Sequence, residues 1–336
     1  MNMTTYRQFN YFTRVFILLA ASVLTMLSSC STNDGDTTGT LVGEWYKKSD
    51  FEGVSRSGAV VITIDNKAYM GTGFDGTKWL KDWWEYDPEL DFWVRKADLP
   101  GTARTSAVAF TAGGKGYVGT GYDGVGQLKD FWEYDPAADA WTQVANFGGT
   151  ARYGALAFTV DDKGFVGTGY DGNYLKDIWE YDPGSNTWNQ KVSVGGSKRT
   201  NAFAFVVNGK AYVGGGKNNG VLQQDFWEFD PTSNSWTAKT ALDEDDYTIA
   251  RELASTFVIN GYGYVACGMI SAIDSEVWEY DAANDTWTEK TTFEGSAREN
   301  AIGFSIGSKG YVATGRNSGL RYDDIWQFDP TAEDTD

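Results

Sequence analysis

Histidine is absent from this 336-residue chain. Histidine is the side chain that most often moves protons near neutral pH, and it is the commonest protein ligand for transition metals. Its absence therefore excludes a serine nucleophile activated by a histidine base and copper centres built on histidine. No cluster of cysteine or carboxylate residues replaces such a site in the sequence, so we expect neither a metal nor a cofactor.

Cysteine, proline and positive charge are also scarce. The chain has 2 cysteines and 6 prolines, and its 28 lysines and arginines face 46 aspartates and glutamates, for a net charge of −18. A surface this acidic repels phosphate backbones, so nucleic acid is not an expected partner. Glycine is abundant, with 40 residues, and aromatic residues make up 15% of the chain. This composition favours many short strands joined by tight turns.

The first thirty residues have the features of an export signal. Arg7 and Arg14 precede an apolar run over residues 15–27, and small residues follow up to Cys30. The run is shorter than the about 20 apolar residues that cross a bilayer, and the order basic, apolar, small is typical of a secretory signal peptide. We therefore predict a signal peptide over residues 1–29 that is removed from the mature protein.

Residues 27–30 (LSSC) resemble a bacterial lipobox. That resemblance implies that Cys30 is acylated and anchors the chain in the outer membrane, facing either the periplasm or the cell surface. An ordinary cleaved signal with a chance cysteine is the alternative. Residues 30–43 are small, polar and acidic, as expected of a flexible tether. Once Cys30 carries lipid, Cys267 has no disulfide partner, and we expect it to be a small core residue.

An internal repeat covers most of the remaining chain. A tryptophan followed by an arginine recurs six times, with the tryptophans 47 to 51 residues apart. The tryptophans are Trp45, Trp93, Trp141, Trp188, Trp236 and Trp287, and the arginines are Arg56, Arg104, Arg152, Arg199, Arg251 and Arg298. Self-similarity at this period indicates one repeat array rather than two separate domains.

Each repeat predicts four short antiparallel strands. An apolar strand follows the arginine, a glycine-rich strand such as GYVGTG comes next, then an aromatic strand such as DFWEYD, and an outer strand surrounds the next tryptophan. Turn residues separate the strands, for example Asn208 and Gly209 after the first strand of the fourth repeat. One repeat is therefore expected to form one blade.

These repeats resemble the Kelch family over residues 45–330, and the resemblance implies an all-β, six-bladed β-propeller over residues 44–336. An extra outer-strand tryptophan at the start, with none at the end, predicts that residues 44–48 supply the outer strand of the sixth blade and close the ring. The sequence departs from the family pattern at the glycine pair, whose first glycine survives only as Gly215. The other five repeats carry Thr72, Thr120, Thr168, Cys267 and Thr314 there.

The six arginines are expected to share one face of the propeller. In a blade of four antiparallel strands, the start of the first strand and the connection between the second and third strands lie on the same face. Six open guanidinium groups around the channel mouth would bind a carboxylate or another planar anion. Alternatively, each arginine pairs with an acidic residue of its own or a neighbouring blade. The candidate partners are Asp82, Asp130, Asp177, Asp225, Glu85, Glu133, Glu180, Glu228 and Glu279.

Positions that differ between the repeats are the better candidates for holding an asymmetric ligand. Neutral variation at exposed strand ends is the alternative interpretation. Positions of this kind just after the arginines include Tyr153, Asn201, Glu252, Glu299 and Asn300. The loops after the second strands of the first three repeats add aromatic residues, which would stack on sugars, anchor a protein or pack in the core. These are Trp79, Tyr122, Tyr170 and Tyr174.

Two functions follow from these features. The first is a non-catalytic, monomeric, lipid-anchored propeller that binds a glycan or a protein partner at the outer membrane through the arginine face. The second follows from the resemblance, because secreted Kelch propellers include mutarotases and epimerases acting on sialic acid. It implies a carboxylated sugar held by the arginines, with Glu252 or Glu299 as acid or base. The galactose-oxidase-like activity of other Kelch propellers implies copper with histidine ligands, and this chain has no histidine.

Overall fold

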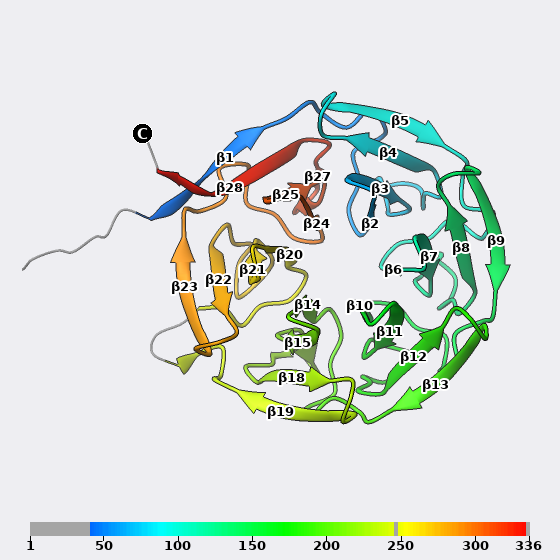
Figure 1. Ribbon diagram of the computed structural model, residues 1–336. Coiled ribbons are helices and arrows are strands. Elements are labelled where there is room, and N and C mark those ends of the chain that lie inside the picture. The colour runs from blue at the N-terminus through cyan, green and yellow to red at the C-terminus, as the bar shows by residue number, and fades with distance from the viewer. Residues whose placement is uncertain (1–40, 245–247, 334–336) are drawn as a thin grey trace, which may run out of the picture. The chain divides into compact units, whose positions relative to one another are not determined.

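The structure, a computed structural model, describes residues 41–244 and 248–333. These residues form a ring of six blades around a central axis, and each blade is a sheet of four antiparallel strands (Figure 1). The all-β, six-bladed propeller predicted from the repeats is therefore confirmed. The predicted signal peptide and Cys30 lie outside the described residues.

The first strand of each blade lines the axis, and a tight turn leads from it to the second strand. In blade 4 this turn is formed by Asn208 and Gly209, whose φ angles of 52° and 76° suit a two-residue hairpin turn. The first strands of blades 1 to 6 are β2 (Val60–Ile64), β6 (Val108–Ala112), β10 (Leu156–Val160), β14 (Phe203–Val207), β20 (Ser255–Ile259) and β24 (Ile302–Ile306). The second strands are β3 (Lys67–Gly71), β7 (Lys115–Gly119), β11 (Lys163–Gly167), β15 (Lys210–Gly214), β21 (Tyr262–Ala266) and β25 (Lys309–Ala313).

The third and fourth strands lie further from the axis, and the fourth strand forms the rim. The third strands are β4 (Trp83–Asp87), β8 (Phe131–Asp135), β12 (Ile178–Asp182), β18 (Phe226–Asp230), β22 (Val277–Asp281) and β28 (Ile325–Glu333). The fourth strands are β5 (Phe92–Lys96), β9 (Ala140–Val144), β13 (Thr187–Lys191), β19 (Ser235–Lys239), β23 (Thr286–Lys290) and, in blade 6, β1 (Val42–Lys47).

Strand β1 closes the ring, as the sequence predicted. It pairs antiparallel with β28, so the last blade combines both ends of the described chain (Figure 1). Trp45 lies opposite Phe328 in this pairing, is 3% exposed, and donates its indole N–H to the carbonyl of Thr291 in blade 5 at 3.3 Å. No helix long and apolar enough to cross a membrane occurs in the ranges 41–244 and 248–333.

The hydrophobic core is divided into six layers, one between each pair of neighbouring blades. The layer between blades 1 and 2, for example, brings Trp83 together with Val118 and Tyr134. Cys267 is buried in the layer between blades 5 and 6, which confirms it as a core residue, and burial raises the pKa of its thiol to about 12. Because each blade needs both neighbours to cover its faces, the ring is expected to fold as one unit.

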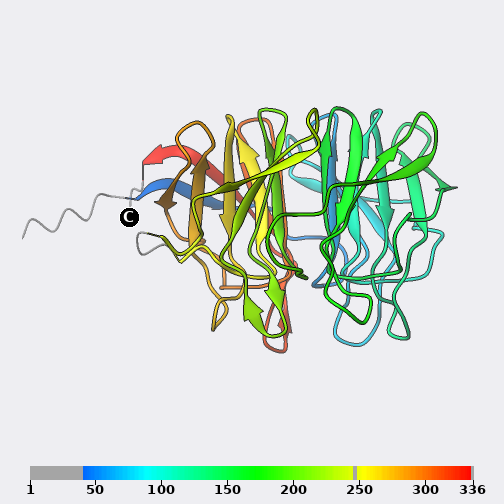
Figure 2. The ribbon, with the colours of Figure 1, turned by 90° about the horizontal axis from the view of Figure 1, so that it is seen from below.

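The two faces of the ring differ in their connections. The loop face, as we name it, carries the connections between second and third strands, and the turn face carries the tight turns between first and second strands. Figure 2 shows the longer loops on its lower side. In blades 4 and 6 these connections form small hairpins, β16 (Lys217–Asn218) with β17 (Val221–Leu222) and β26 (Arg316–Asn317) with β27 (Leu320–Arg321). Ser57, next to Arg56, bridges to Phe74 in such a loop, so the predicted shared face is confirmed.

Candidate functional site

The six arginines do not form an open ring at the channel mouth, because each is buried with at most 1% of its surface exposed. Arg56 shows the arrangement. Its two terminal nitrogens bond the two carboxylate oxygens of Asp82 at 2.6 Å, and its Nε–H donates to the carbonyl of Val54 at 3.0 Å. The equivalent pairs are Arg104–Asp130, Arg152–Asp177, Arg199–Asp225, Arg251–Glu276 and Arg298–Asp324.

In each ion pair the guanidinium is buried and the carboxylate side chain is 16–31% exposed. Burial raises the pKa of Asp82, but the bonds and charge of Arg56 outweigh burial and hold the pKa below its ordinary value. The ring of Phe51 covers the guanidinium of Arg56 at 4.9 Å. The expectation of an open anion-binding ring is therefore corrected. The alternative inferred from the sequence, in which each arginine pairs with an acidic residue, is the one present. Each guanidinium is bound by a carboxylate of its own blade.

The arginines also hold the turns where the family glycine is replaced. The four threonines and Cys267 at these positions have φ angles of 56–61°, a left-handed conformation in which a β-branched residue is an outlier. Thr120 is typical: it is fully buried, and its carbonyl accepts a bond from Nη1 of Arg104 at 3.0 Å. The repeated arginine is thus explained by the architecture, since it ties the end of the second strand to the third.

A continuous ring of main-chain hydrogen bonds narrows the channel at the loop face. One residue from each blade, two positions after the arginine, takes part, and all six have φ angles of 51–65°. Each donates its N–H to the carbonyl of its counterpart in the preceding blade at 2.8–3.1 Å, and the bond from Gly58 to Asn300 completes the circle. The members are Gly58, Ser106, Gly154, Asn201, Leu253 and Asn300.

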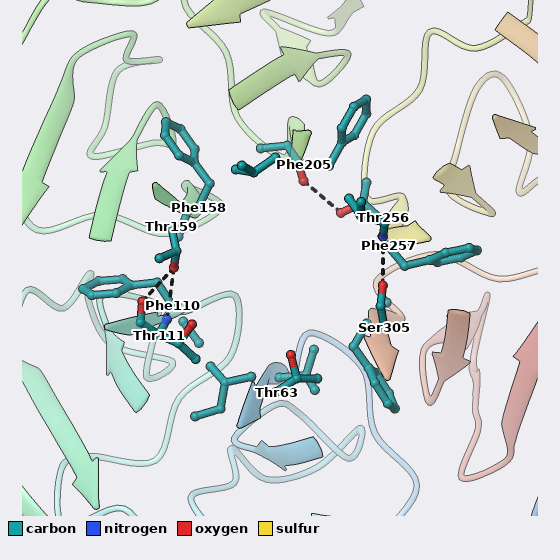
Figure 3. A pocket seen from close by; sticks show the side chains of 18 residues that line it. Thr63, Phe110, Thr111, Phe158, Thr159, Phe205, Thr256, Phe257 and Ser305 are labelled. Carbon is teal, nitrogen blue, oxygen red and sulfur yellow. Dashed lines mark hydrogen bonds between the residues drawn. The ribbon is translucent and has the colours of Figure 1, made fainter. Parts of the chain in front are cut away.

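The channel itself carries no charged side chain among its lining residues. It widens towards the turn face into a hollow of about 350 Å³, where threonine and serine hydroxyls lie at the centre and phenylalanine rings point away between the blades (Figure 3). Some hydroxyls tie neighbouring inner strands together. Thr159 Oγ1 accepts from the N–H of Thr111 at 3.2 Å and donates to its carbonyl at 2.8 Å. The channel therefore offers no counter-charge for a carboxylated ligand.

Six aromatic side chains form a continuous band on the loop face of blades 1 to 3, which we call the aromatic arc. Each ring contacts the next, with centroids 5.0–6.5 Å apart, and every member is partly exposed. Burial, with the neighbouring tyrosines, raises the pKa of Tyr153 in the middle of the arc. In order, the members are Phe74, Trp79, Tyr122, Tyr153, Tyr170 and Tyr174. The structure thus brings together the predicted residues Trp79, Tyr153 and Tyr174.

In blades 4 to 6 the positions of the aromatic arc carry mostly charged and amide side chains, with the aliphatic Met269 and Ile273 in blade 5. The carboxylate of Glu252 accepts bonds from Lys217 at 2.6 Å and from the amide of Asn201 at 3.0 Å, and Glu299 accepts from Nε of Arg316 at 2.7 Å. The side chains of the two glutamates are only 8% and 5% exposed. Both candidate acid–base groups are therefore paired with a cation and largely covered, and their catalytic role stays a prediction.

A hollow of about 230 Å³ lies where the aromatic arc meets the hairpin of blade 4. Its lining combines the rings of Tyr170 and Tyr174 with Asn218, Asn219 and Lys198. Lys198 forms no ion pair within the described part of the chain. Sequence reasoning did not select Lys198 and the two asparagines as site residues. The segment KNNG of the fourth repeat, which replaces the YDG turns of repeats two and three, is the signal that indicates a different loop there. In the described ranges, no group of three or more cysteine, aspartate or glutamate residues could hold a metal ion.

Comparisons with known proteins agree with the Kelch-like repeats and with the propeller fold. Residues 149–299 match the KLHDC2/KLHL20/DRC7 Kelch-repeats domain. Among 806 matching chains of solved structures, the structure of YjhT has a TM-score of 0.71 at 15% sequence identity, and the match covers 83% of this chain and 96% of that one. No curated protein matches the chain. At this identity the structural likeness establishes the fold alone.

Proposed function

We propose that this chain, a Kelch-type six-bladed propeller, is a non-catalytic binding protein that takes a glycan on its loop face. The observation that carries the proposal is the aromatic arc, which runs unbroken over three blades and ends at a hollow lined by two asparagines. The other three blades have no such aromatic band within the described residues and carry the ion pairs of Glu252 and Glu299 instead. The loop face is therefore asymmetric, as a site for an asymmetric ligand must be.

The chemistry of the hollow suits a sugar. The C–H face of a pyranose ring can stack on Tyr170 or Tyr174, which present an apolar body with a polar hydroxyl. The amides of Asn218 and Asn219 supply donors and acceptors for sugar hydroxyls, and a few such polar groups beside aromatic walls are typical of small-ligand sites. Lys198 would favour a sugar that carries a negative charge.

Glycan binding is tested first by a thermal-shift screen of neutral and carboxylated sugars, because a ligand that binds only the folded state raises its melting temperature. For a sugar that shifts the protein, calorimetry then compares two tyrosine variants. Tyr174→Ala removes one wall of the hollow and is expected to weaken binding about tenfold, or about 1.4 kcal/mol. Tyr262→Ala, at a 39% exposed position on the turn face, should leave binding unchanged. Equal losses in both variants, or no sugar that shifts the protein, would contradict the proposal.

A protein partner on the same face is the second candidate, and the loop tips favour it. Val125, Val221 and Leu320 come from blades 2, 4 and 6 and are 94%, 64% and 69% exposed. Apolar side chains at such exposure can be buried by a partner. A triple variant with serine at these positions should lose a protein partner but keep glycan binding, so it separates the two functions.

The proposed location is the outer membrane, through an acylated Cys30, and the lipobox resemblance supports it. Metabolic labelling with a clickable fatty acid is expected to mark the wild-type chain and to fail in the Cys30→Ser variant. Labelling that survives in Cys30→Ser would refute the anchor.

A further inference from the structure

The outer strand of blade 1 and the turn before it differ from those of blades 2 to 5 by an apolar surface. In blade 6, Val42 and Tyr46 of β1 are also exposed, at 43% and 42%. Leu90, Phe92 and Val94 are 74%, 51% and 42% exposed. At the same positions, the outer edges of blades 2 to 5 carry only alanine, serine, threonine and asparagine. The equivalent residues are Ala138, Ala140 and Thr142; Ser185, Thr187 and Asn189; Ser233, Ser235 and Thr237; and Asn284, Thr286 and Thr288. Blades 2 to 5 fold without large apolar residues at these three positions. Packing within the blade therefore does not explain Leu90, Phe92 and Val94 in blade 1.

Strand β5 also has one free edge. Among the described strands it pairs with β4 alone, and it runs along the rim of the ring (Figure 1). Side chains alternate along a strand, so Trp93 points into the core at 2% exposure while Phe92 and Val94 point outward. An exposed edge strand with apolar side chains is a template for pairing with another strand.

The charges on this segment indicate which strand pairs with it. The exposed Glu89 precedes β5, and Arg95 lies near its end with Lys96. The side chain of Arg95 is 58% exposed and forms a surface ion pair with Asp98 at 2.9 Å, which leaves the guanidinium open to solvent and to a second acidic group. We infer that β5 pairs with β5 of a second copy of this chain, antiparallel across a twofold axis near Trp93. Phe92 then lies beside Val94 of the partner subunit, and Arg95 lies beside the acidic turn that precedes the partner's strand.

This arrangement joins the two four-stranded blades into one eight-stranded sheet. It replaces the monomer expected from the sequence, and it goes beyond the proposed glycan binding because the rim is separate from the loop face. A lipid surface fits the segment less well, since Glu89 and the paired Asp91 would enter an anionic interface with the apolar residues. One short strand and three apolar side chains per subunit form an interface below about 1,200 Å², which is typical of weak complexes.

The test is sedimentation velocity on residues 41–336, which form one compact unit, from about 1 to about 200 µM, the range that covers a micromolar dissociation constant. The sedimentation coefficient of the wild type is expected to rise with concentration to that of a dimer. A variant with Leu90→Ser, Phe92→Ser and Val94→Thr carries the residues of blade 4 and is expected to stay monomeric, with an unchanged melting temperature. Val125→Thr, at a more exposed apolar position on the loop face, should dimerise like the wild type.

Charge reversal tests the antiparallel register itself. Arg95→Glu alone is expected to weaken the dimer about tenfold, and adding Glu89→Arg should restore it, because both charges of the pair are then reversed on both subunits. The inference would be overturned if the wild type sedimented as a monomer at all concentrations. It would also be overturned if the monomeric wild type floated with lipid vesicles and this binding required Leu90, Phe92 and Val94. Glycan binding measured on the monomeric variant is expected to be intact, so failure of this inference leaves the proposed function untouched.

Discussion

Ring closure through β1 leads to a quantitative prediction at Trp45. Its indole packs against Phe293 and Phe328 with ring centroids 4.9 and 4.8 Å apart, and its N–H donates to the carbonyl of Thr291. Replacing a buried aromatic residue by alanine removes its transfer free energy and leaves a cavity, at a cost of about 3–5 kcal/mol. The lost hydrogen bond adds about 1 kcal/mol. Because domains are stable by only about 5–15 kcal/mol, Trp45→Ala is expected to remove a large part of the stability.

The measurement compares Trp45→Ala with Tyr46→Ala by thermal and urea denaturation. Tyr46 is the next residue of the same strand, is 42% exposed, and its hydroxyl donates to the nearby Glu44, so its loss should cost no more than about 0.5 kcal/mol. At about 2 °C per kcal/mol for a domain of this size, Trp45→Ala should melt roughly 7–11 °C lower than Tyr46→Ala. Equal melting temperatures would show that the two chain ends do not carry the stability of the ring, and the closure argument would be wrong.

Three further predictions concern the ion pairs and the glutamates. Asp130→Asn leaves the buried Arg104 without a counter-charge and should cost about 3 kcal/mol in urea denaturation, whereas Asp98→Asn, at an exposed pair, should cost less than about 0.5 kcal/mol. The aspartates of four of the pairs have folded-state pKa values below the unfolded value of about 3.9. Their stabilisation is therefore fully present above that value and is lost as the pH falls from it through the lower folded-state pKa values. The melting temperature should therefore drop steeply below about pH 4, and a flat profile down to pH 2 would contradict the paired geometry. Glu252→Gln and Glu299→Gln test the mutarotase alternative by NMR of sugar anomerisation: a rate that falls in either variant would favour catalysis, and no rate above background in the wild type would leave binding as the function.

The architecture could be predicted in detail because its signals are local and repeated. The tryptophans, arginines and turn residues recur at a constant spacing, and the unpaired Trp45 at the start identified the closing strand. The observed strand β1 begins at Val42, slightly before the predicted residue 44. Boundaries shift in this way because strand ends depend on hydrogen bonds to a partner, here β28, that lies almost 300 residues away in the chain.

The candidate site could be predicted only in part. Sequence differences between repeats pointed to Tyr153 and to the aromatic residues of the loops after the second strands. Those residues do meet on the loop face. The contacts that make them a continuous arc join residues of neighbouring blades, such as Trp79 and Tyr122, and no periodicity reports such contacts. Lys198, Asn218 and Asn219 were missed because two separate connections bring them to one hollow.

The sequence by itself determined the number of blades, the strands of each blade, the closing strand and the face that carries the arginines. These features follow from spacing and alternation, which depend on neighbours along the chain. Only the tertiary structure decided that the arginines are buried against carboxylates rather than open to a ligand. The direction of a side chain follows from the partners that surround it, and here a buried guanidinium needs the counter-charge that Asp82 and its equivalents provide.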